Sequence, residues 1–202
     1  SFLAVGSPLF WSVLGGWTLT DDYYVDNVPI PWQGRALFVP DMPIGRLVET
    51  PEEIIGIAQA FLSSTGTVDP KSALVTGYDF FEDGSAAVAV ALSDLSLKLM
   101  NDPGWTGENL RQQLIQEGYD INVINAHFTH YAGLSANGFN SDNMSDFLGS
   151  SQVAAAASTR NLLNRIVFSM GCHAGLSVPD RSAAAADPAF GFDPALDFPQ
   201  AM

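Results

Sequence analysis

The sequence predicts an α/β fold in which helices cover both faces of a mainly parallel sheet. Strand-like and helix-like segments alternate through most of the 202 residues, which is the pattern of such folds. The strand-like segments are continuous apolar runs, as expected for strands that helices bury on both sides. With 47% hydrophobic residues and no sign of a linker, the chain suits one domain with a substantial core.

In the first half of the chain, apolar runs that end near Gly or Pro predict three strands, at 1–6, 35–39 and 72–78. A helix is predicted to begin after Thr50, because Thr50 can cap it and Pro51 suits its first position. Glu53 completes a capping box, and the helix should end between residues 63 and 66. A second helix is predicted over 85–100, which is rich in alanine and leucine.

The second half continues the alternation and carries the chain's most reactive side chains. We expect helices over 106–116 and 150–163, strands over 121–126 and 165–170, and a loop over 132–146. All three histidines and the only cysteine follow these two strands: His127 and His130 the first, Cys172 and His173 the second. Because sites in open α/β sheets gather beyond the carboxyl ends of the strands, we expect these residues to lie near one another.

A thiol beside an imidazole is the arrangement of a cysteine nucleophile and its general base. Neighbouring parallel strands lie about 4.8 Å apart, so residues just beyond their ends can meet. Two other interpretations stay open. A single cysteine at a strand end is often a small buried apolar residue, with structural histidines nearby. His127, His130 and His173 together with Cys172 would also suit a zinc ion.

The charge of the chain limits its partners. Eight basic residues against 22 acidic ones give a net charge of −14. This charge argues against nucleic acid and against anionic membrane surfaces as partners, because both are negatively charged, and it slightly favours basic substrates. No stretch of about 18 uncharged apolar residues is present, so we expect no membrane span.

Five segments follow one another in a specific order. They are an apolar strand ending in Val-Gly at 2–6, Asp-Asp-Tyr-Tyr at 21–24, Pro-Asp-Met-Pro-Ile-Gly-Arg at 40–46, the strand with its histidines at 121–130, and the strand ending in Gly-Cys at 167–172. In this order they resemble the gingipain-type branch of the caspase-like cysteine peptidases. Cys172 follows the histidines by 42 and 45 residues, close to the separation of about 50 in caspases.

The resemblance implies a caspase-like three-layer sandwich and a cysteine endopeptidase activity. Cys172 would be the nucleophile. His130 would be the general base, because the histidine of this family usually lies a few residues past its strand, and His127 is the alternative base. Backbone N–H groups of Cys172 and Tyr131 would form the oxyanion hole.

For the whole protein, the resemblance implies a protein or peptide substrate and no cofactor for catalysis, and it allows a structural calcium ion at Asp21 and Asp22. We expect residues 1–202 to be one peptidase domain, a fragment that lacks its C-terminal part. We also expect a secreted or envelope-associated bacterial protein, with the cytoplasm as the alternative. Two other functions stay open: a caspase-like scaffold that binds without cleaving, and a metal-binding protein that uses the His and Cys residues.

Overall fold

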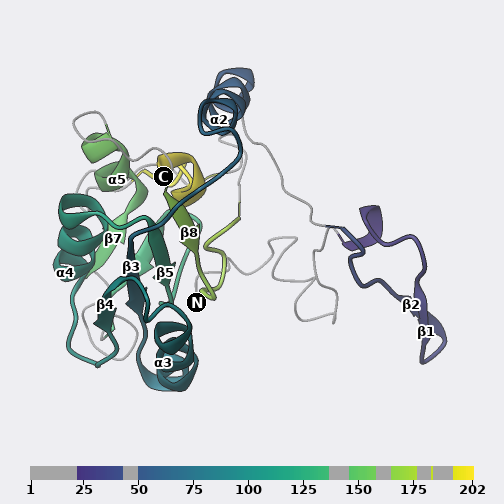
Figure 1. Cartoon of the computed structure of the whole chain (residues 1–202), viewed down its shortest axis with the longest axis horizontal. Coiled ribbons are helices and arrows are strands. Elements are labelled where there is room, and N and C mark those ends of the chain that lie inside the picture. The colour runs from purple at the N-terminus through teal and green to yellow at the C-terminus, as the bar shows by residue number, and fades with distance from the viewer. Residues whose placement is uncertain (1–21, 43–49, 137–145, 158–164, 177–182, 184–192) are drawn as a thin grey trace. The chain divides into compact units, whose positions relative to one another are not determined.

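The computed structural model describes residues 22–42, 50–136, 146–157, 165–176, 183 and 193–202 (Figure 1). The chain divides into two compact units, residues 1–47 and residues 48–202. The strand predicted at 1–6 lies outside the described residues. Among the described residues, no helix has the length and apolar character that crossing a membrane requires.

The described part of the first unit is a short helical turn followed by a hairpin. The turn is η1 (Asp22–Tyr24), and the antiparallel strands are β1 (Ile30–Trp32) and β2 (Arg35–Leu37). Gln33 and Gly34 join them with φ angles of 48° and 76°, the conformation of a two-residue hairpin turn that matches the twist of the strands. The strand predicted at 35–39 is therefore present, but it belongs to this hairpin and not to the parallel sheet.

The second unit is built on a four-stranded parallel sheet, which confirms the predicted α/β class. Its spatial order is β4-β3-β5-β8. The strands are β3 (Ser72–Thr76), β4 (Ser96–Met100), β5 (Ile121–Ile124) and β8 (Ile166–Phe168). All three pairings between these strands are parallel, so their carboxyl ends lie at one edge of the sheet.

The helix predicted over 85–100 is wrong in its second half. The structure has a helix α3 (Glu82–Ala91) and then the strand β4. Residues 96–100 pair with β3 along its whole length, from Ser72 opposite Ser96 to Thr76 opposite Met100. Leucine, lysine and methionine favour helices in isolation, but this pairing with a buried strand outweighs the local preference.

The loop predicted over 132–146 is also wrong at its start. Residues 132–134 form β6 (Ala132–Leu134), which pairs antiparallel with β7 (Phe147–Gly149). β6 is completely buried, and its glycine lets the strand lie against the ring of Phe128. A short strand of small residues has no apolar run of strand length, so the pattern of the sequence did not reveal it.

Three further helical segments of the second unit follow the sequence-based expectation closely. They are α2 (Pro51–Ser63), α4 (Gly107–Arg111) continued by the π-helix η3 (Gln112–Glu117), and α5 (Ser150–Ala157). The structure adds the short helices η2 (Asp79–Phe81) and α6 (Phe198–Ala201). The predicted capping box of α2 is confirmed: Oγ1 of Thr50 accepts from the Glu53 N–H, and Oε2 of Glu53 accepts from the Thr50 N–H. The part of the predicted helix 150–163 after residue 157 lies outside the described residues.

Helices lie on both faces of the sheet (Figure 1). On one face, Leu74 of β3 and Ile124 of β5 pack in a buried cluster with Leu110, Leu114, Val153 and Phe198 of α4, η3, α5 and α6. Val123 points to the other face, because side chains alternate along a strand, and it lines a cavity together with Val88 of α3. This confirms the predicted layering.

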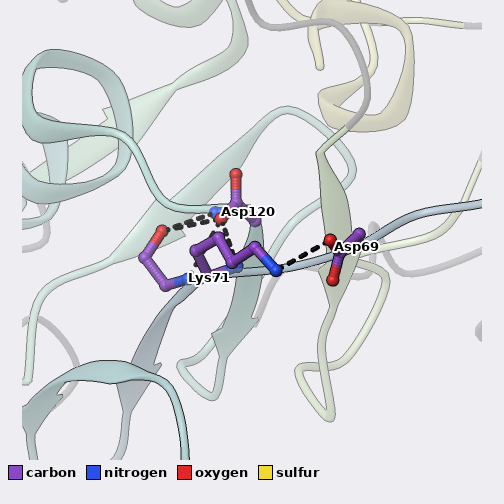
Figure 2. A network of polar contacts seen from close by, with 4 residues as sticks. Asp69, Lys71 and Asp120 are labelled. Atoms are coloured by element: carbon purple, nitrogen blue, oxygen red, sulfur yellow. Dashed lines mark hydrogen bonds and ion pairs between the residues drawn. The ribbon is translucent and has the colours of Figure 1, made fainter.

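A carboxylate joins the starts of two strands (Figure 2). Oδ2 of Asp120 accepts hydrogen bonds from the N–H of Lys71 at 2.8 Å and from the N–H and Oγ of Ser72, both at 3.0 Å. The Lys71 N–H contributes most to lowering the pKa of this carboxyl, with the Ser72 groups and the charge of Arg165 adding to it against the opposing effect of burial. Asp120 thus fixes the entry of β3 beside that of β5.

Replacing Asp120 with asparagine is expected to lower the free energy of unfolding at pH 7 by about 1–2 kcal/mol, because hydrogen bonds to a charged acceptor are weakened or lost. The folded-state pKa is lowered, so this stabilisation is complete above the unfolded-state pKa of about 4. It disappears as the pH falls through the folded-state value. Urea unfolding of both proteins between pH 3 and pH 7 measures the difference.

Asp69→Asn is the matched control, because Asp69 only pairs with the Lys71 ammonium at the surface (Figure 2). Both side chains of this pair are at least 75% exposed, so we expect a change below about 0.5 kcal/mol. Equal effects of the two substitutions would contradict a specific role of Asp120.

Candidate active site

The carboxyl ends of β5 and β8 bring a histidine and the cysteine to the same level of the sheet. In the parallel register of these strands, Val123 lies opposite Phe168. His127 and Cys172 each follow this pair by four residues. Both residues therefore lie beyond the carboxyl ends of adjacent strands, at matching positions along the chain.

His127 and Cys172 both line one cavity of about 880 Å³. The thiol of Cys172 belongs to an exposed residue, so it is accessible to a molecule that enters. This volume is within the range of small-molecule and peptide sites in proteins. Of the described residues that line the cavity, His127 is the histidine, whereas His130 and His173 do not line it.

The walls of the cavity are almost entirely apolar. Its floor is the face of β5 and β8 that carries Ile121, Val123 and Phe168, and one wall is the side of α3 with Val88 and Leu92. None of the described lining residues is Asp, Glu, Lys or Arg. The polar side chains among the described lining residues are those of Ser85, Asn125, His127, Ser169 and Cys172.

Aromatic rings hold the imidazole of His127 in place. Tyr78 meets it edge to face at 5.9 Å between ring centroids, and Phe80 does the same at 5.9 Å. The His127 backbone N–H donates to the hydroxyl of Tyr78 at 3.3 Å. Burial lowers the pKa of His127, and the nearby Asp79 carboxylate partly opposes this shift. The lowered pKa favours the neutral imidazole, the form that accepts a proton, near pH 7.

His130, the base favoured from the sequence, lies in a different environment. Its Nε2 is 2.9 Å from the carbonyl oxygen of Pro194. A carbonyl can only accept, so this nitrogen carries the hydrogen and donates. The ring also meets Tyr131 edge to face at 4.9 Å. His173 lies close enough that the charge of His130, added to burial, lowers the pKa of His173.

The predicted oxyanion-hole residue Tyr131 is not brought to the cavity. Its N–H donates to Oγ1 of Thr129 at 3.2 Å, and its carbonyl accepts from the N–H of Ser150 at 2.7 Å. Cys172, the other predicted donor, is a lining residue. Of these residues, Cys172 and His127 line the cavity, and His130 and Tyr131 do not.

Asn125 is a site residue that the sequence analysis missed. Its side chain donates from Nδ2 to Oγ of Ser85 at 3.0 Å and accepts at Oδ1 from the N–H of Met170 at 3.3 Å. Ser85 in turn donates to the carbonyl of Thr76 at 2.8 Å. This buried network connects β3, α3, β5 and the segment that carries Cys172. An asparagine inside an apolar run, Ile-Asn-Val-Ile-Asn-Ala, was the signal that could have revealed it.

The calcium ion allowed by the resemblance would bind at Asp21 and Asp22. Asp21 and the side chain of Asp22 lie outside the described residues. Within the described parts of the chain, no three or more His, Cys, Asp or Glu side chains are grouped so that they could hold a metal ion. This finding gives no support to the zinc interpretation of the three histidines and Cys172.

Comparisons of the chain with models of known protein families, with curated proteins and with solved structures find no match. The functional conclusion therefore depends on the residues of this chain and their geometry.

Proposed function

We propose that the protein is a cysteine peptidase in which Cys172 is the nucleophile and His127 is the general base and acid. The observation that carries this proposal is that the two residues, at matching positions beyond adjacent parallel strands, line one cavity. Their order along the chain and the motifs around them support a caspase-like, gingipain-type domain. The four-stranded parallel sheet with helices on both faces is compatible with that fold.

The proposed reaction uses four proton transfers through one imidazole, two in each half. His127 accepts the proton of the Cys172 thiol, and the sulfur attacks the carbonyl carbon of the scissile peptide bond. The carbon–nitrogen bond then breaks, and His127 donates its proton to the leaving amine. In the second half, His127 accepts a proton from water, whose oxygen attacks the thioester. The carbon–sulfur bond breaks, and the proton returns to the sulfur.

His127 suits this role better than His130 for two reasons. It lines the cavity with Cys172, whereas His130 does not line it. Burial also keeps the pKa of His127 low, so that its neutral form is available to accept the thiol proton. Within the described segments, the geometry supports the dyad more directly than the scaffold or the metal site.

Mass spectrometry of the labelled protein tests the proposal. The full chain is treated with a set of peptidyl acyloxymethyl ketones, which react with cysteines that an adjacent base activates. We expect covalent labelling of Cys172 and none in Cys172→Ala. Iodoacetamide serves as the control for access to the thiol. Labelling of Cys172 by iodoacetamide but by none of the peptidyl ketones would refute the peptidase proposal.

A further inference from the structure

The chemistry of the cavity beside Cys172 indicates what enters it. Its lining residues Phe80 and Met170 are 64% and 76% exposed, so we place them at its mouth. Behind the mouth lie the apolar floor of β5 and β8 and the apolar wall of α3. Three phenylalanine rings, counting Phe168 of the floor, are available for the edge-to-face contacts that aromatic side chains prefer.

The polar side chains of the cavity have few groups left for a ligand. Ser85 and Asn125 bond to each other, and their other bonds go to the carbonyl of Thr76 and the N–H of Met170. Ser169 accepts from the N–H of Gly171 at 2.9 Å. None of the described lining residues carries a charge that could pair with the side chain of lysine, arginine or aspartate. Moving such a charge out of water without a partner is costly.

We infer that the substrates of this site are polypeptides with a large apolar side chain, aromatic or aliphatic, at the residue whose carbonyl Cys172 attacks. The inference rests on the proposed function and adds the class of side chain that the site selects. The preference expected from the cavity differs from the one expected from the charge of the whole chain. The net charge of −14 alone would favour basic substrates. The cavity is larger than one side chain, so it accommodates tryptophan and part of a neighbouring residue.

A matched series of probes tests the inference on the full chain. Peptidyl acyloxymethyl ketones that differ only at the residue next to the reactive group carry phenylalanine, leucine, lysine, arginine or aspartate. We expect the second-order rate of Cys172 labelling to be about 10- to 100-fold higher for the phenylalanine and leucine probes than for the charged ones. Rates for lysine or arginine that equal or exceed the rate for phenylalanine would overturn the inference.

A pair of variants tests the role of the cavity itself. Met170→Glu places a carboxylate at the mouth, and Val90→Glu places one on α3 at a residue that does not line the cavity. The two positions are similarly exposed, 76% and 74%, so neither substitution should disturb folding. We expect Met170→Glu to raise the ratio of lysine-probe to phenylalanine-probe rates at least about fivefold, and Val90→Glu to leave it unchanged. An unchanged ratio in Met170→Glu would contradict the inference.

The possible failures are distinguishable. If every probe fails while iodoacetamide still labels Cys172, both the peptidase proposal and the inference on its substrate are refuted. If the lysine or arginine probe labels Cys172 best, the peptidase proposal stands and only the apolar specificity is refuted. Probe rates in the unaltered chain decide between these outcomes without any variant.

Discussion

Replacing His127 with alanine is expected to slow labelling of Cys172 by the best peptidyl ketone at least about 100-fold, the typical contribution of a general base. His127 lines the cavity with Cys172, and burial lowers its pKa, which favours the neutral imidazole. Without it, the thiol has no base among the described lining residues. The measurement is the second-order labelling rate at pH 7, read by mass spectrometry of the Cys172 peptide.

His130→Ala is the matched comparison, because it removes the other histidine that follows β5. His130 does not line the cavity, so we expect the labelling rate to change less than about threefold. Thermal unfolding of both variants shows whether either loss is a folding effect. A large loss in His130→Ala with a small one in His127→Ala would reverse the assignment and restore the base favoured from the sequence.

The position of the site could be predicted from the sequence, because β5 and β8 are apolar runs and the reactive residues follow them directly. The choice between two histidines could not be predicted in this way. It depends on register, since His127 and Cys172 stand four residues beyond the Val123–Phe168 pair, while His130 stands seven beyond. Register is defined only when two strands pair, so it cannot be predicted from the sequence of one strand.

Other features escaped prediction for related reasons. The strand β4 was expected to be part of a helix, because its leucines, lysine and methionine favour helices until β3 pairs with them. The buried network around Asn125 depends on partners from three other segments, Thr76, Ser85 and Met170. By contrast, the capping box of α2 depends on neighbours in the chain and was predicted correctly.

Replacing Gly171 with alanine should reduce Cys172 labelling about 100-fold, because the segment carrying the cysteine touches the end of β5. A Cβ at residue 171 would lie 2.5 Å from the carbonyl oxygen of Ala126 and 2.5 Å from the ring of Phe128. The ring cannot retreat: Phe128 is 2% exposed and packs edge to face on Phe198 at 5.2 Å. The clash must therefore move either the His127 segment or the Cys172 segment, and a displacement of about 1 Å in a catalytic group has an effect of this size.

Gly175→Ala separates misplacement from a general effect of alanine near the cysteine. A Cβ at Gly175 has no other atom within 4 Å, so we expect the labelling rate to stay within about twofold and the free energy of unfolding within about 0.5 kcal/mol. For Gly171→Ala we expect the free energy of unfolding to fall by about 1–3 kcal/mol, because the added methyl group overpacks the site. Labelling of this variant is therefore measured well below the melting temperature of the variant. Iodoacetamide should still reach Cys172 in both variants. An unchanged labelling rate of Gly171→Ala with the peptidyl ketone would contradict the prediction. It would show that the close contact at Gly171 does not position Cys172 and His127.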